Sequence, residues 1–529
     1  MPAAPPSPDG ACSDLARRGA ARRRWAVYSL LIAIATGQMA GRLLAVNSVD
    51  LVRLEQQRVS QRLESFRSEL TEAGVPAEEV EQRVESRRVE LQEKLRLQRP
   101  FLSGNDRSRW LAIRALVEHG TYEIDRVLEE PTWDTIDMVK HPNRDGAPRL
   151  YSSKPPLLVT LLAGKYWLIY KLTGCTLGTH PYTIGRAMLV TTNLLPMALM
   201  MVLVAAVAER LFDRIEGGST NDDKWLASDW PRMFVVASAA FGTLLTPFAV
   251  VLNNHLVGAV SASIALYAWA RVRLDGDRRG RWFALAGAAA AFTAANELPA
   301  LALLVFLGVL LMRAPRQTVL CFVPAALVVV AAFFATNYAA HNSLRPPYMH
   351  RSGTEPSDNW YDYTYTRAGR ERDSYWNQRR GMDVGEPSRA KYALHALVGH
   401  HGVFSLTPIW LLSFAGAAYS LARGNAVERE LAGLILSLSV VCFTFYIGLR
   451  GQMDRNYGGM TAGFRWMFWF APLWLAAMAP AVAWLAKTRA GRTLAGVLLA
   501  LSALSTAYPT WNPWRQPWLY DWFEALGWV

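Results

Sequence analysis

AMLVTTNLLPMALMMVLVAAVA, residues 187–208, carries no charged side chain along its whole length and is followed at once by Glu209 and Arg210. A helix needs about 20 apolar residues to cross a hydrocarbon core about 30 Å thick. The run therefore predicts a membrane-spanning helix. It belongs to a chain of 529 residues that is 52% hydrophobic and only 19% charged, a composition too apolar for a soluble protein of this length.

Similar apolar runs recur from residue 25 onward, and few of them carry a charge in the middle. Together they predict an all-α, multi-pass transmembrane helix bundle of about eleven spans. The predicted spans are residues 25–46, 187–208, 233–252, 256–270, 282–295, 298–312, 318–337, 403–422, 431–449, 466–486 and 493–508.

The positive-inside rule sets the predicted topology. Arginines crowd the tail before the first span, which places the N-terminus in the cytoplasm and residues 47 onward outside a cell (inner) membrane. The apolar segment 155–172 holds Lys165 and Lys171 and opens with two prolines. If it crossed the membrane, every later basic cluster would face outward, so we interpret it as a juxtamembrane or re-entrant helix against the outer face.

This topology divides the chain into segments with different expected roles. They are a basic cytoplasmic tail (1–24), the first span (25–46), an extracytoplasmic helical hairpin (47–99), an extracytoplasmic first-loop catalytic segment (100–186), a transmembrane bundle (187–337), an extracytoplasmic aromatic and basic loop (338–402), a C-terminal transmembrane bundle (403–508) and an extracytoplasmic Trp-rich tail (509–529).

The net charge of +13 does not require a nucleic-acid partner, because the cytoplasmic clusters and the arginines of the outer loops account for much of it. The four cysteines, at positions 12, 175, 321 and 442, fall in different compartments and predict no disulfide framework. Residues 50–98 predict two charged helices broken at Gly74-Val75-Pro76. Such a hairpin either packs on itself as a solvated insertion or docks a protein partner.

Chemistry is expected in the first outer loop. FLSGNDRSRWLAIRALVEHGTYEID, residues 101–125, predicts an amphipathic helix that Asn105 and Asp106 can cap. Capping is a common role for Asp, but this carboxylate is followed by PRLYSSKPPLL, residues 148–158, where Arg149 and Lys154 are cations beside the membrane surface. An acid close to cations that can bind phosphate is typical of a group-transfer site.

These residues resemble the GT-C superfamily of integral membrane glycosyltransferases. The chain is most similar to the bacterial branch of protein O-mannosyltransferases and lipid A aminoarabinose transferases, which use polyprenyl-phosphate sugars. The likeness rests on NDRSRWLAIRALVEHGTYEID, on YSSKPPLLVTLLAGKYWLIYKLTG and on the following Arg186. It covers about residues 100–212; the remainder matches only as a pattern of helices.

The resemblance implies an inverting transfer from a polyprenyl-phosphate-linked sugar donor to a lipid, glycan or protein acceptor. Asp106 matches the family's general base, and Lys154 matches the lysine that pairs with the donor phosphate. Arg109 in the first motif, Tyr151 at the start of the second and Arg149 two residues before it are further substrate-binding candidates. Many relatives have a second acid where this chain has Arg107, so the acceptor class and any divalent cation stay open; the sequence itself indicates no metal site or cofactor.

Three later positions are also substrate-binding candidates. His255 and Glu297 lie in polar turns between spans, where such residues often only cap helices, yet a carboxylate in a long apolar run is costly enough to suggest a role. Arg465 follows a glycine-rich loop and precedes a span. An arginine beside tryptophans is often a membrane anchor, but here it can hold phosphate oxygens bidentately.

The loop 338–402 contains NWYDYTYTRAGRERDSYWNQRR, residues 359–380, whose aromatic and basic residues suit either sugar stacking or a place among lipid headgroups. We interpret it as an acceptor-binding lid. The alternative to a glycosyltransferase is a transporter or flippase of lipid-linked saccharide, in which the same cations guide headgroups without bond formation.

Overall fold

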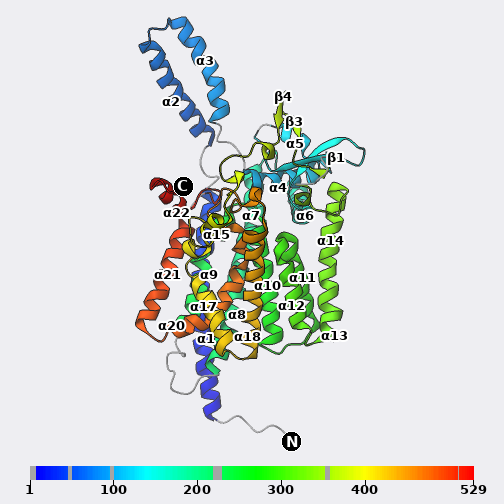
Figure 1. Cartoon of the computed structure of the whole chain (residues 1–529), viewed down its shortest axis with the longest axis vertical. Helices are drawn as coiled ribbons and strands as arrows, with labels where there is room; N and C mark the ends of the chain where they lie inside the picture. Colours follow the sequence, from blue (N-terminus) through cyan, green and yellow to red (C-terminus); the bar gives the residue numbers. More distant parts are fainter. Residues whose placement is uncertain are drawn as a thin grey trace.

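The computed structural model describes residues 8–45, 51–95, 101–130, 132–217, 229–351, 358–367, 369–509 and 512–529. In this part of the chain nearly all regular structure is helical, and the strands form two two-stranded antiparallel sheets. Figure 1 shows long helices side by side in a bundle, with both sheets and several short helices gathered at the end opposite the N-terminus. We call this the site end of the bundle. The predicted all-α class is confirmed in its main feature.

Within the described residues, six helical stretches are long and apolar enough to cross a membrane, as expected of a membrane protein. They are Gly19–Ala45 within α1 (Pro8–Ala45), Pro181–Ile215 across α7 (Pro181–Leu189) and α8 (Leu195–Gly217), Asn254–Arg273 (α10), Pro315–His341 from α13 (Pro315–Gln317) to α14 (Val323–His341), Ala426–Leu449 beginning with α18 (Ala426–Phe443), and Arg489–Ala507 (α21). A bent pair, Arg465–Ala477 and Ala479–Leu485, becomes a seventh if its halves, inclined at 50°, form one span.

By length and composition the structure does not reach the predicted count of about eleven spans. The other four predicted spans coincide with shorter helices: α9 (Trp230–Phe241), α11 (Gly280–Asn296), α12 (Leu301–Leu311) and α17 (Trp410–Arg423). Proline explains one of these limits, because α17 begins two residues after Pro408, which has no backbone N–H to donate within a helix. All four still pack against the longer helices (Figure 1).

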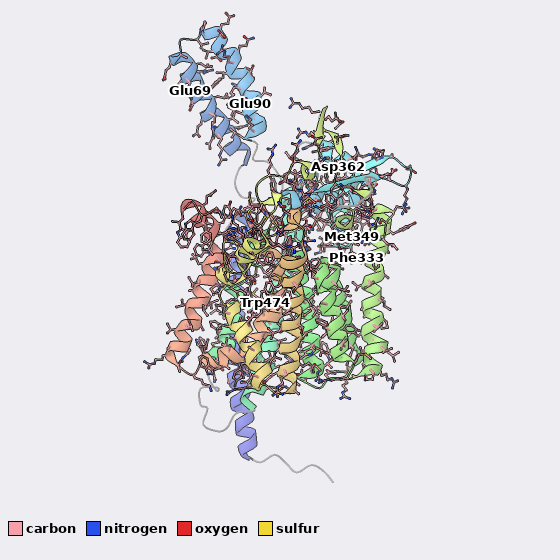
Figure 2. The ribbon with its side chains drawn as sticks, viewed as in Figure 1. Glu69, Glu90, Phe333, Met349, Asp362 and Trp474 are labelled. Carbon is pink, nitrogen blue, oxygen red and sulfur yellow. The ribbon has the colours of Figure 1, made fainter. Side chains whose placement is uncertain are left out.

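The predicted charged hairpin is present. It consists of α2 (Leu51–Glu72) and α3 (Ala77–Lys94), which pack on each other through a small apolar cluster that includes Val59, Leu63 and Val84. Gly74 lies in the turn with φ of 72°, a left-handed conformation that favours glycine. Figure 2 shows Glu69 and Glu90 on this hairpin, away from the bundle that encloses Trp474.

The first-loop segment builds most of the site end. It contains α4 (Gly104–Arg114), α5 (Asp125–Glu129), β1 (Met138–Pro142), β2 (Pro148–Ser152) and α6 (Pro156–Thr173). β1 and β2 pair antiparallel with Met138 opposite Ser152. This strand hairpin was not predicted, although Asn143-Arg144-Asp145-Gly146 is a typical turn sequence. The register places Asp137, just before β1, beside Ser153 and Lys154, just after β2.

The segment after α14 packs onto that strand hairpin. It contains β3 (Thr364–Arg367) and β4 (Arg370–Asp373), which form the second sheet. The Lys140 amide donates a hydrogen bond to the Trp360 carbonyl at 3.0 Å, and the Tyr363 hydroxyl donates to the Met138 carbonyl at 3.1 Å. Two loops far apart in the sequence therefore form one cap over the bundle.

The core runs through the bundle and includes the fully buried Trp269, Trp469 and Trp474. Polar side chains also join helices, since Arg24 of α1 donates a hydrogen bond to Glu209 of α8 at 2.7 Å. The remaining helices near the site end or in the C-terminal half are α15 (Arg389–Leu397), α16 (Val403–Leu406), α19 (Ala471–Ala477), α20 (Ala479–Leu485) and α22 (Trp518–Ala525).

Candidate functional site

Asp106 lies in the first turn of α4 and is only 1% exposed. Ser103, not Asp106 or Asn105, is the helix cap, because its hydroxyl accepts a hydrogen bond from the Asp106 amide. One Asp106 carboxylate oxygen accepts from the Trp110 indole at 2.9 Å and the Leu252 amide at 2.8 Å. The other accepts from the Leu102 amide at 3.2 Å. Asp106 therefore joins α4 to the segment that precedes α10.

Burial raises the pKa of Asp106 to about 6, although these hydrogen bonds and the charge of Arg109 oppose the rise. The carboxylate is nevertheless committed to protein donors, and Asp106 is not among the residues that line the neighbouring cavity. Its position fits a role in holding α4 in place.

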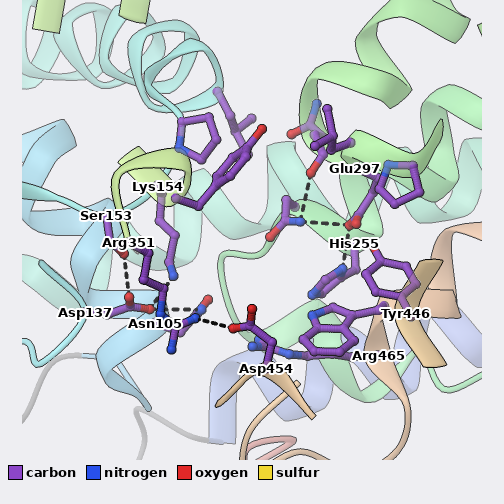
Figure 3. A pocket seen from close by; sticks show the side chains of 18 of the residues that line it. Asn105, Asp137, Ser153, Lys154, His255, Glu297, Arg351, Tyr446, Asp454 and Arg465 are labelled. Atoms are coloured by element: carbon purple, nitrogen blue, oxygen red, sulfur yellow. Dashed lines mark hydrogen bonds and ion pairs between the residues drawn. The ribbon is translucent and has the colours of Figure 1, made fainter. Parts of the chain in front are cut away.

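The principal cavity has a volume of about 420 Å³ and lies between the first-loop segment, the turns before α10 and α12, and the loops that follow α14 and α18. We call it the central cavity; Figure 3 shows it from close by. Five cationic and three acidic side chains line it: Arg109, Lys154, Arg351, Arg450 and Arg465 with Asp137, Glu297 and Asp454. With His255 neutral, the lining has a formal excess of two positive charges.

Asp137 is the carboxylate that faces Lys154 (Figure 3). The Lys154 ammonium forms an ion pair with one Asp137 oxygen, the Ser153 hydroxyl donates to the other at 2.5 Å, and the Asn105 amide donates at 3.1 Å. Burial disfavours the ionised carboxylate, but the adjacent Lys154 charge and these hydrogen bonds outweigh it, so the pKa of Asp137 lies below its ordinary value.

For Lys154, burial outweighs the effect of its charged partner. Burial lowers the pKa of Lys154 to about 8, with Arg109 and Arg465 adding repulsion, and the Asp137 carboxylate only partly offsets these effects. The ammonium is therefore held in a site that would bind a second anion favourably, because one neighbouring carboxylate does not balance the local positive charge.

A chain of hydrogen bonds crosses the wall of the cavity from Asn105 to His255. Arg109 donates to the Asn105 side chain at 2.6 Å and to the Asn254 side chain at 2.5 Å. Asn254 donates to Glu297 at 2.8 Å, and the His255 ring contacts the same carboxylate oxygen at 2.5 Å. Since Asn105 also contacts Asp137, the two carboxylates Asp137 and Glu297 are linked through fixed polar side chains.

The later loops add a second group of charges. Arg351 donates to Asp454 at 2.6 Å, and Arg450 lies 3.7 Å from the same carboxylate. The Arg351 guanidinium stacks 4.6 Å above the Trp376 ring, which also lines the cavity. Stacking on an aromatic face keeps a guanidinium oriented while leaving its edge able to bind an anion.

Arg465 reaches the cavity from the start of the bent pair. Its guanidinium lies 4.7 Å from the Trp514 ring centroid, and in the described part of the chain its Nε atom has no hydrogen-bond partner. Gly458, with φ of 98°, allows this approach, because a Cβ atom there would lie 2.7 Å from Arg465 Nε. The glycine-rich loop therefore serves close packing around this arginine.

The structure brings most of the predicted substrate-binding residues together. Those that line the central cavity are Arg109, Lys154, His255, Glu297 and Arg465. Arg149 and Tyr151 do not line it. Arg149 is 3.5 Å from Glu123, and Tyr151 stacks on His141 with ring centroids 4.1 Å apart.

Sequence reasoning missed Asp137, Arg351, Arg450 and Asp454. The turn sequence between residues 142 and 148 could have revealed Asp137, since a strand hairpin around it places residue 137 opposite residue 153. Nothing local distinguishes Arg351, Arg450 and Asp454 from the many other charged residues of their loops. In the described residues, no group of three or more His, Cys, Asp or Glu side chains is arranged to hold a metal ion.

Comparison with known proteins adds no relative: no family model matches the chain, and no curated protein matches it. The central cavity and the chemistry of its lining are therefore the basis of the functional assignment.

Proposed function

We propose that the protein is a GT-C type glycosyltransferase that moves a sugar from a polyprenyl-phosphate donor to an acceptor hydroxyl. The observation that carries the proposal is the convergence of Lys154, Arg109 and Arg465 with Asp137 in one cavity. Such a site offers cations for a phosphate and a carboxylate for a hydroxyl proton.

The charge of the lining favours a phosphate leaving group. Five cations against three carboxylates leave two positive charges in excess. A polyprenyl-phosphate sugar is a phosphodiester with one negative charge, whereas the departing polyprenyl phosphate approaches two. A preorganised excess of positive charge stabilises the charge that develops as the glycosidic bond breaks more than it stabilises the bound donor.

In this mechanism Asp137, rather than Asp106, is the general base. The donor phosphate takes the place of Asp137 as the partner of Lys154, which frees the carboxylate for the acceptor hydroxyl. The acceptor oxygen then bonds to the anomeric carbon, the bond from that carbon to the phosphate oxygen breaks, and the hydroxyl proton passes to Asp137. Asp106 acts as a positioning residue through Trp110 and Leu252.

Apolar residues in the same cavity suit the prenyl chain. Leu157 and Leu158 of α6, Leu298 and Pro299 before α12, and Phe445 line the cavity beside the charged groups. Leu298 is 47% exposed, so the apolar side reaches the surface of the bundle. A phosphate bound at Lys154 would place its isoprenoid tail along these side chains.

The proposal includes the topology expected from the basic loops. The four shorter helices join the six long ones and the bent pair as spans, the chain resides in a cell inner membrane, and the site end faces away from the cytoplasm. The first-loop helix α6 then lies against the membrane at the site end, where Figure 1 draws it beside α4 and α14.

The first prediction concerns Asp137→Asn in protein reconstituted in lipid nanodiscs. The assay measures release of polyprenyl phosphate from two donors, polyprenyl-phosphate mannose and polyprenyl-phosphate aminoarabinose, with a membrane extract as the source of acceptor. We expect the rate of release to fall roughly 100- to 10,000-fold, which is the usual contribution of a general base. Binding of undecaprenyl phosphate, measured by tryptophan quenching, should stay within about threefold because the cations remain.

The matched control is Asp454→Asn, a carboxylate in the same cavity that contacts Arg351 but not Lys154. It should retain most of the transfer activity. A flippase makes the opposite prediction: movement of the lipid-linked sugar between leaflets without polyprenyl-phosphate release, and little sensitivity to Asp137→Asn. That outcome would reject the proposed glycosyltransferase activity and support the transporter or flippase.

A further inference from the structure

A second cavity is lined by the tip of the β1–β2 hairpin and by the end of α14. It has a volume of about 380 Å³, and no residue lines both it and the central cavity. We call it the α14 cavity. Its lining includes Tyr122, Glu123, Arg144, Tyr151 and His341. Tyr151, which the sequence singled out for substrate binding, thus belongs here.

Two histidines at this cavity fix each other's protonation. The His141 Nδ1 atom lies 2.9 Å from the Pro142 carbonyl, which can only accept, so Nδ1 carries the proton. In the neutral ring the His141 Nε2 atom is then an acceptor, and it receives a hydrogen bond from His341 Nδ1 at 3.0 Å. The neutral state is favoured because burial lowers the pKa of His141 to about 4.

This arrangement leaves a lone pair on His341 Nε2. The side chain is 5% exposed, and Nε2 has no hydrogen-bond partner in the described part of the chain. A buried acceptor without a donor costs free energy that a hydroxyl donor would recover. The ring cannot turn over to escape this, since His341 Nδ1 is needed by His141.

The remaining groups suit a neutral ligand rather than a phosphate. Glu123 and Asp145 are accompanied by Arg144, and Arg149 lies 3.5 Å from Glu123, so the charges around the α14 cavity balance. Tyr122 and Tyr151 supply aromatic rings. Aromatic faces combined with paired donors and acceptors are complementary to sugar rings, which present apolar faces and many hydroxyls.

The α14 cavity also lies close to the central one. A gap of about 10 Å³, roughly the space of one water molecule, is lined by Lys154, Tyr151 and His341. Lys154 lines this gap and the central cavity, whereas Tyr151 and His341 line the gap and the α14 cavity. A ligand in the α14 cavity is therefore separated from the donor phosphate site by only a few side chains.

We propose that the α14 cavity is a binding site for a neutral saccharide, whose hydroxyl donates a hydrogen bond to His341 Nε2 after a small adjustment of the lining. Resting on the proposed function, this saccharide is a part of the acceptor glycan away from the reacting hydroxyl, which itself lies at Asp137 in the central cavity. The acceptor class is thus a neutral glycan rather than an acidic lipid or an unmodified peptide.

The second prediction tests this site with three probes, maltotriose, mannotriose and chitotriose, titrated against the full chain in nanodiscs by saturation-transfer difference NMR. At least one probe should bind, and its affinity should fall about three- to tenfold in His341→Phe, which keeps a ring but removes the Nε2 lone pair together with the Nδ1 donor to His141. His341→Gln, which restores an acceptor, should recover part of the affinity. Asp145→Ala, at the exposed hairpin tip, should weaken binding without risk to the fold.

The control His180→Phe changes a histidine that lines neither cavity and should leave affinity unchanged. The inference is overturned if none of the three probes binds. It is also overturned if His341→Phe and Asp145→Ala both bind the probe as tightly as the unchanged protein does. Arg465→Gln separates the two proposals: it should weaken undecaprenyl phosphate binding and spare the saccharide. If the saccharide binds in a way that depends on His341 but undecaprenyl phosphate does not bind at all, the proposed function is rejected and the saccharide site in the α14 cavity is supported.

Discussion

Lys154 and Asp137 are the pair on which the proposed chemistry depends. Asp137 is buried, and the Lys154 side chain is 18% exposed. The ammonium holds the pKa of Asp137 below its ordinary value, whereas burial lowers the pKa of Lys154 and the Asp137 carboxylate offsets this only in part. A buried ion pair of this kind contributes little to stability, because desolvation offsets most of the attraction. It is better explained as a site prepared for a further anion.

The third prediction follows from the pKa of Lys154, which burial lowers to about 8. Below this pH the side chain is a cation that binds phosphate, and above it the charge is lost. We expect the affinity for undecaprenyl phosphate to fall about tenfold between pH 7.5 and pH 9.5, as one charge-assisted contact disappears. Lys154→Arg should abolish the fall because the guanidinium stays charged. Identical pH profiles for the two proteins would show that Lys154 does not contact the phosphate.

At the scale of elements, α4 lies where the sequence predicted an amphipathic helix, and Arg109 of that helix lines the central cavity together with Lys154 of the Lys-Pro-Pro motif. Asp106, the predicted general base, is not part of this lining and contacts protein donors with both carboxylate oxygens. The base proposed instead, Asp137, precedes a short strand. Its position depends on the β1–β2 register, which brings it against Lys154.

The fourth prediction separates these two carboxylates. Asp106→Asn puts an amide where an acceptor is needed by Leu102, Trp110 or Leu252, so we expect the free energy of unfolding to fall by about 1–3 kcal/mol. Transfer activity per folded molecule should drop far less than in Asp137→Asn. Thermal unfolding in detergent and turnover on the same preparation measure both. If Asp106→Asn lost all turnover while its thermal unfolding stayed unchanged, Asp106 rather than Asp137 would be the general base.

On the whole-molecule scale, the helices that are long and apolar enough to cross a membrane follow from apolar runs that any hydropathy window detects, such as residues 187–208. The charged helices α2 and α3 follow equally from periodicity and the Gly-Val-Pro break. His255 and Glu297 were also predictable, because polar groups in apolar surroundings are costly. Arg351, Arg450 and Asp454 were not, since only the packing of distant loops brings them to the cavity.

The cap over the bundle explains why those loops matter. Asp137, just before β1, lines the cavity, and β1 itself is hydrogen-bonded to the segment that contains Trp360 and Tyr363. Tyr361 of the same segment contacts Trp376 and Arg351. The central cavity and the α14 cavity are thus both lined by the first-loop segment and by the chain at or after the end of α14. A hydrogen bond between a strand and a loop far away in the sequence has no local sequence signal.

The most direct measurement is a cryo-electron microscopy structure of the full chain in nanodiscs with undecaprenyl phosphate bound. We predict density for the phosphate in the central cavity, within hydrogen-bonding distance of Lys154 and Arg465, with Asp137 released from the lysine and the isoprenoid tail along Leu157 and Leu298. Density for the phosphate elsewhere, or Lys154 and Arg465 on walls too far apart to share one phosphate, would contradict the account.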